Sequence, residues 1–398
     1  MAQRHLDPTD HVAGPAPTGD ALAGYLRGQA TEFLRALRLH RENGSGANGS
    51  EGSVDAALAL RRAARRISAT LHTFQPLLDT DWSEGMRPEL AWVSGTLAME
   101  HAYTSRLERL LTALHRLSGT DPTAPAAGSR VAPAAGSRAD VAAGSRAGTA
   151  AGARADAAAG SRAAGAAPVP QRAAPRDAGL RNPPPSTPER SNLTVGAAKA
   201  GALLDRQLTL ARTRAHSTAL QAMGSSRFHA IADKVAVLAS EVPLTKTATT
   251  TDLRPLATAA HDRLTDAVTA LPLITAGHPY NAAALIHGLS PDTVPHPQDA
   301  PWHQVRLLLR LHRYAREVVL GEPDGTSDLR LLAAGQALNQ HRDASEAAAA
   351  AAQAARTPRI APATAYALGV LHADQRHEVE AARFTFQQCW QKEAVSTR

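Results

Sequence analysis

Apolar side chains recur at helical spacing along most of this chain. In residues 20–42 the apolar positions follow the 3.6-residue period of an amphipathic helix, at Leu22, Tyr25, Leu26, Phe33, Leu34 and Leu37. Similar periodicity predicts further helices in residues 54–75, 81–97, 104–119, 194–223, 227–238, 253–271, 301–320, 327–356 and 361–394. No segment alternates apolar and polar residues as a strand does. The sequence therefore predicts an all-α fold.

Two segments lack this periodicity and divide the chain. Residues 121–193 repeat an Ala-Ala-Gly-Ser-Arg-like octapeptide and end in a Pro-rich stretch, a composition that cannot bury a core. We interpret them as a disordered linker, in which the regular arginines leave loose contact with an anion open. Residues 1–18 are predicted to be a disordered tail. Residues 19–120 and 194–398 then form the first helical half and the remaining helices.

The segment 302–321, WHQVRLLLRLHRYAREVVLG, has an unusual helical wheel. His303, Arg306, Arg310, Arg313 and Tyr314 lie on one edge together with Glu317, and most of the remaining circumference is apolar. A surface helix normally shows the opposite, a narrow apolar stripe and a broad polar face. We therefore expect this helix to be packed on most sides and open to one polar groove. The cationic edge is about 15 Å long, which suits an extended anion.

The first half of the chain carries a partial copy of this pattern. In LALRRAARRISATLHTF, Arg61 and Arg65 repeat the spacing of Arg306 and Arg310, and Arg62 and Arg66 flank them. Two similar helices indicate an internal duplication whose cationic edges face one shared groove. The alternative is a solvated arginine face on each helix.

Net charge and cysteine content narrow the class of protein. The net charge is +7, but the linker accounts for most of it, with nine arginines against five acids. Bulk charge therefore does not indicate a polyanionic partner. Arginine suits phosphate contacts, but GC-rich coding is the better explanation for the excess of Arg over Lys. One cysteine, no apolar N-terminal signal and no run of 18 apolar residues together predict a cytoplasmic protein with no membrane partner.

Several motifs together resemble the CHAD family, the conserved-histidine α-helical domain. HQVRLLLRLHRYARE is similar to the family's His, Arg, basic and Arg-Tyr pattern. QALNQHRDA resembles the turn that follows it, and ALGVLHADQRHEVEAARFTFQQCW resembles the closing helix. RTRAHSTALQAMGSSRFHAIADKVAVL and RRISATLHTFQPLLDTDW are similar to the middle helices and the first-half motif. The resemblance covers residues 20–118 and 194–395.

This resemblance implies a fold and a ligand. The family folds as two pseudo-symmetric antiparallel helical bundles with a basic cleft, and it binds inorganic polyphosphate without catalysis, sometimes at polyphosphate granules. The expected binding residues are His303, Arg306, Arg310, Arg313, Tyr314, Arg61, Arg65 and Arg66. Leu58 stands where the first motif of the family has His, so we expect tighter binding by the second motif.

No other chemistry is indicated by the sequence. It has no alternating Glu-x-Glu-x-Lys strand, phosphate-binding Gly-rich loop, Gly-x-Ser-x-Gly elbow or His-Glu-x-x-His pair. We therefore expect no enzyme activity, no metal site and no cofactor. His372 and His377 are interpreted as surface residues, and Cys389 as a small core residue.

Two other functions remain open. The first is a nucleic-acid binder that uses the same groove, although few aromatic residues are present to stack on bases. The second is a helical scaffold whose arginine edge is paired internally with acids such as Glu317 and Asp343.

Overall fold

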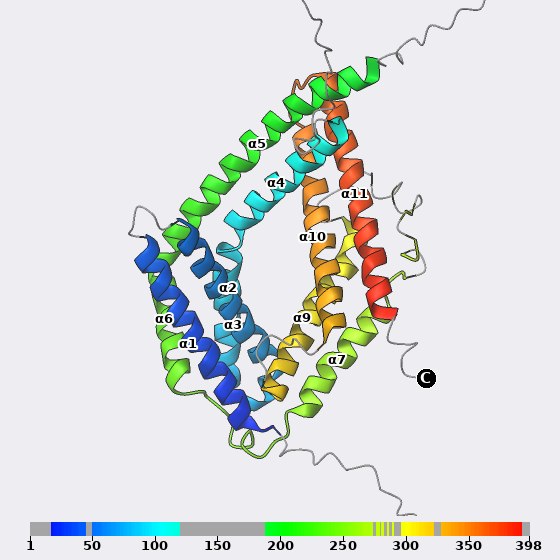
Figure 1. Cartoon of the computed structure of the whole chain (residues 1–398). Coiled ribbons are helices and arrows are strands. Elements are labelled where there is room, and N and C mark those ends of the chain that lie inside the picture. The colour runs from blue at the N-terminus through cyan, green and yellow to red at the C-terminus, as the bar shows by residue number, and fades with distance from the viewer. Residues whose placement is uncertain are drawn as a thin grey trace, which may run out of the picture. The chain divides into compact units, whose positions relative to one another are not determined.

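The computed structural model describes residues 17–44, 50–119, 188–273, 276–278, 280–281, 285, 289, 296–321 and 328–391. Its helices are α1 (Gly19–Gly44), α2 (Ser50–Thr73), η1 (Gln75–Leu77), α3 (Thr80–Thr96), α4 (Met99–Ser118), α5 (Pro188–Met223), α6 (Ser226–Ser240), α7 (Arg254–Thr269), η2 (Pro297–Asp299), α9 (Ala300–Leu320), α10 (Leu329–Ala355) and α11 (Pro362–Gln391). Figure 1 labels most of them. Within these ranges the only β pairing is an isolated bridge between Leu78 and Leu244. The all-α prediction is confirmed.

Local chemistry explains where the helices begin and end. The Asp79 carboxylate accepts a hydrogen bond from the Trp82 amide at 2.8 Å and caps α3. The Asp328 carboxylate caps α10 through the Leu331 amide at 3.1 Å. Gly321 follows α9 at φ 68°, a left-handed conformation that glycine adopts without strain. The predicted helices therefore have real start and stop signals in their sequences.

Two predicted boundaries differ from the structure. The helix α5 begins at Pro188, inside the predicted linker, because proline is well tolerated in the first turn of a helix. At the other end of the chain, the Pro17 carbonyl accepts a hydrogen bond from the Leu253 amide at 2.9 Å, so the predicted tail makes a contact at its last residues. The rest of the predicted tail and linker, residues 1–16 and 121–187, lies outside the described residues.

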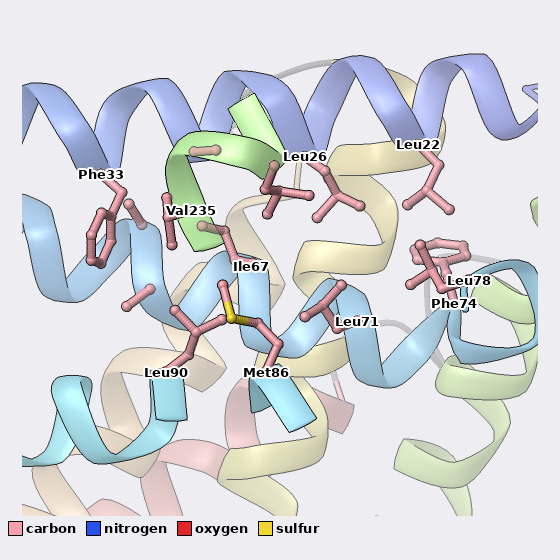
Figure 2. Close-up of a cluster of buried hydrophobic side chains, with 14 of the residues drawn as sticks. Leu22, Leu26, Phe33, Ile67, Leu71, Phe74, Leu78, Met86, Leu90 and Val235 are labelled. Carbon is pink, nitrogen blue, oxygen red and sulfur yellow. The ribbon is translucent and has the colours of Figure 1, made fainter. Parts of the chain in front are cut away.

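The first buried core joins helices from both sides of the linker. Leu22, Leu26 and Phe33 of α1 point toward Ile67 and Leu71 of α2, and side chains of α3 and α6 close the cluster (Figure 2). Helix α6 contributes Phe228, Ile231, Val235 and Leu238 to this core. Burial of each large apolar side chain contributes about 1.5–3 kcal/mol, so α6 is an integral part of this core.

Two further cores involve helices that follow the linker. One is formed by α7, α9, α10 and α11 around Trp302 and Phe386. The other joins α4 and α5, which run side by side, to α10 and α11. Helix α9 contributes Trp302 and Val305 to one core, and Ala315 and Val318 to the first. Because α9 is packed in both cores, its polar edge is held next to α2.

No helix in the described part of the chain is both long enough and apolar enough to cross a membrane.

Candidate anion-binding site

Arginines from three helices meet where α9 contacts α2 and α10. Arg61 and Arg65 come from α2, Arg306 and Arg310 from α9, and Arg342 from α10; we call these five residues the arginine cluster. Arg61, Arg65 and Arg306 are each repelled by at least two other members, and Arg310 is repelled by Arg342 and by Arg313. The two cationic edges that the sequence placed on separate helices therefore face one another.

The charges of the cluster repel one another. Burial, followed by repulsion between neighbouring guanidinium groups, lowers the pKa of Arg65 to about 9. The same causes lower the pKa of Arg61 and of Arg306 to about 10, and they also lower the pKa of Arg310. With pKa values of about 9 to 10, Arg61, Arg65 and Arg306 remain protonated at neutral pH, so the repulsion persists. An anion at this position would relieve it.

Most of the cluster lacks an internal counter-ion. Arg61, Arg306 and Arg310 form no ion pair with any described residue, and the Nε atoms of Arg61 and Arg306 are buried without a hydrogen-bond partner there. Arg65 donates only from Nε to the Ser94 hydroxyl, at 3.0 Å. Buried polar groups normally have partners, so these donors are available to a ligand.

The nearby carboxylates are already engaged. Asp343 accepts a hydrogen bond from Arg342 Nε at 2.9 Å. Glu346 pairs with Arg106 of α4 and lies 3.8 Å from Arg342 Nε. The predicted internal pairing of the α9 arginines with Asp343 is therefore not what the structure shows. The cluster keeps a net positive charge.

Arg66 has a different environment from the other predicted binding residues. Its Nε lies 2.9 Å from Oε2 of Glu317, and the Tyr25 hydroxyl donates to the same oxygen at 2.8 Å. Burial and the adjacent Glu317 raise the pKa of Tyr25 far above its usual value. We expected Glu317 to compensate an arginine of its own helix, but its carboxylate is held by α1 and α2 instead. This buried pair ties the first core to α9.

The remaining predicted binding residues lie around the cluster. The His303 ring contacts His341 edge-on, with centroids 5.4 Å apart, and burial lowers the pKa of His303. The Arg66 guanidinium lies 5.6 Å from the Tyr314 ring centroid. Arg313 extends alongside α10 at Gly335. Histidine and tyrosine thus flank the arginines on α9, as the wheel predicted.

A buried ionic network supports the His303 end of the site. The Asp299 carboxylate is fully buried and accepts hydrogen bonds from Arg376 (2.8 Å), Arg383 (2.7 Å) and Ser345 (2.6 Å). Burial alone would raise the pKa of Asp299, but these donors and His341 lower it overall. His341 Nε2 lies 3.6 Å from Asp299, and burial lowers the His341 pKa to about 4. The network fixes the start of α9 against α10 and α11.

A cavity of about 490 Å³ lies beside the cluster, between α2, α3 and α9. Its polar lining consists of Arg65, Ser68, His72, Arg87, Ser94 and Arg310. No carboxylate is among its described lining residues, so the cavity is a cationic extension of the arginine cluster.

Sequence reasoning missed some of these residues. Arg342 and Arg106 belong to the charged surroundings of the site, and their signal in the sequence was weak, because single arginines on helices usually face solvent. The described residues contain no group of three metal-ligating side chains. His372 Nδ1 lies 3.0 Å from the Ala348 carbonyl oxygen, and Cys389 packs against the core around Trp302.

An all-α fold in which cationic edges of two helices meet is the arrangement expected of the family that the motifs resemble. The family model of the CHAD domain matches residues 28–352, and the chain belongs to the CHAD domain family, as the motifs indicated. Among solved structures, PptA from Streptomyces chartreusis is 68% identical in sequence, with a TM-score of 0.68, over 94% of this chain and 100% of that chain. The comparison with curated proteins gave no match.

Proposed function

We propose that this protein binds inorganic polyphosphate, without catalysis, on the arginine cluster. The observation that carries the proposal is the convergence of Arg61, Arg306 and Arg310, which have no counter-ion among the described residues. Membership of the CHAD family supports it. His303, Arg313 and Tyr314 flank this surface and extend the contact along α9.

The chemistry of the cluster matches a phosphate polymer. Guanidinium groups donate paired hydrogen bonds to phosphate oxygens, and such charge-assisted bonds are stronger than neutral ones. An extended polyanion places one phosphate after another along α9. Binding would provide the buried Nε groups of Arg61 and Arg306 with acceptors. Arg66 contributes differently, since its pair with Glu317 holds α2 against α9.

The test compares two polymers. Binding of long-chain polyphosphate and of single-stranded DNA is measured at several salt concentrations for the wild type and for an Arg61→Ala/Arg306→Ala/Arg310→Ala variant. A matched control replaces three exposed arginines of α1, Arg35, Arg38 and Arg41, which changes the net charge by the same amount. We expect polyphosphate affinity to fall by about a hundredfold or more in the cluster variant, since hydrogen bonds to charged groups contribute about 1.5–3 kcal/mol each. The control should bind like the wild type.

Other outcomes would contradict the proposal. Unchanged polyphosphate binding in a folded cluster variant would exclude this site. Equal affinity for DNA and polyphosphate would favour the nucleic-acid alternative. No binding to either polymer would favour the scaffold. Incubation with polyphosphate should release no orthophosphate if the protein is not an enzyme. A fluorescent fusion of the protein tests whether it lies in the cytoplasm and at polyphosphate granules.

A further inference from the structure

The cavity beside the arginine cluster is lined by two kinds of side chain. Arg65 and Arg310 of the cluster belong to its polar lining, together with the hydroxyls of Ser68 and Ser94. Its aliphatic lining includes Leu90, Ala91, Leu307 and Leu311, which we call the apolar wall. Inorganic polyphosphate has no apolar group to place against such a wall. The proposed function therefore leaves this part of the cavity unexplained.

Two details suggest that the apolar wall contacts a ligand. Leu307 is 45% exposed although it lies on α9 between Arg306 and Arg310, so much of its apolar surface is open to solvent. His72 Nδ1 is buried without a hydrogen-bond partner among the described residues, and the Ser94 hydroxyl accepts from Arg65 while keeping its own proton. The cavity thus offers an aliphatic surface together with unused hydrogen-bonding groups.

We propose that the cavity binds the nucleoside of a nucleoside 5′-polyphosphate whose phosphates lie on the arginine cluster. The inference rests on the proposed function, because it uses the same arginines for the phosphates. The cavity volume of about 490 Å³ lies within the usual range for small-molecule sites, about 300–1,000 Å³. Leu307 and Leu311 cover a face of the base, and Ser68, Ser94 and His72 provide donors and acceptors for its edge or the ribose. Burial, followed by repulsion from Arg87 and Arg263, lowers the pKa of His72 below its usual value.

The test compares ATP with inorganic tripolyphosphate by calorimetry, without divalent cations. Both ligands have three phosphates, and tripolyphosphate carries the higher charge, so electrostatics alone favours tripolyphosphate. We expect ATP to bind at least about tenfold more tightly, because covering the apolar wall adds a contribution that tripolyphosphate lacks.

A matched pair of glycine variants locates the nucleoside. Gly95 of α3 lines the cavity, and an added Cβ there meets no atom within 4 Å, so Gly95→Leu adds an aliphatic side chain to the lining from an open position. Gly85 lies on the same helix, is equally open and does not line the cavity, so Gly85→Leu is the control. Gly95→Leu should remove the preference for ATP and leave long-chain polyphosphate binding unchanged. Gly85→Leu should leave both unchanged.

The outcomes separate this inference from the proposed function. Equal or weaker binding of ATP than of tripolyphosphate, with polyphosphate still bound, would overturn the nucleoside site alone. Persistence of the ATP preference in Gly95→Leu would also overturn it. If the wild type bound neither ATP, tripolyphosphate nor long-chain polyphosphate, the polyphosphate proposal itself would be refuted.

Discussion

The arginine cluster leads to the prediction that removing one of its charges stabilises the empty protein. Arg306→Met keeps the length of the side chain but removes a buried guanidinium whose Nε has no partner among the described residues. A buried unsatisfied polar group costs about 1–3 kcal/mol, and Arg306 is also repelled by Arg310 and Arg342. We therefore expect the free energy of unfolding to rise by about 1–2 kcal/mol.

Thermal unfolding without polyphosphate measures the stability of the ligand-free protein, and unfolding with polyphosphate measures how much the ligand stabilises it. A gain of this size should raise Tm by about 2–4 °C for a domain of this size. At a ligand concentration of 100 times Kd, polyphosphate should stabilise the wild type by about 2.7 kcal/mol and the variant by much less. The ligand-free wild type would then be less stable than the variant because it retains an arginine that is needed for binding.

Arg66→Met is the control for this prediction. Arg66 is as cationic as Arg306 but is paired with the buried Glu317, so its removal should cost about 3–5 kcal/mol. If Arg306→Met destabilised the protein by a similar amount, Arg306 would be a structural residue and our interpretation of the cluster would be wrong.

Three further predictions concern other parts of the fold. Burial, then repulsion by His261 and Arg316, lowers the pKa of His312 to about 4 from 6.5. The free energy of unfolding should therefore be at its full value above pH 6.5 and fall by up to about 3 kcal/mol as the pH drops to 4. Denaturant unfolding at pH 7 and 5 should show a smaller loss for His312→Phe than for the wild type; an equal loss would assign the effect to other groups. Asp299→Asn should lower the free energy of unfolding by about 3–5 kcal/mol, since it removes the carboxylate that pairs with both Arg376 and Arg383, and a cost below 1 kcal/mol would contradict this. On α5, Gly196→Ala should cost about 1–3 kcal/mol in chemical denaturation because its Cβ overlaps the Ala363 carbonyl, whereas Gly201→Ala, with ordinary contacts to Leu111, should cost nothing; equal effects would refute the close approach.

The sequence predicted the local features of this molecule well. Helix positions follow from periodicity and capping within a few residues, and both are properties of short segments. The cationic edge of α9 was predictable for the same reason, since a helical wheel needs only one helix.

Contacts between distant segments were not predictable in the same way. A wheel shows that Glu317 lies on a polar edge but cannot show that Arg66 and Tyr25 bind it. Asp299, just before α9, gave no signal that two arginines of α11 surround it. Likewise, the apolar face of α6 was visible, but its place in the first core was not. Long-range partners depend on how helices pack, which a single sequence does not specify.

The composition of the first core has a consequence for synthesis of the protein. A ribosome completes α1, α2 and α3 long before it reaches Phe228 of α6, and longer before it reaches Val318 of α9, yet all of these share one core. The nascent N-terminal segment therefore exposes Leu26, Ile67 and their neighbours while most of the chain is still being made. We expect that segment to aggregate when it is expressed alone, and to need a holding chaperone until α9 emerges.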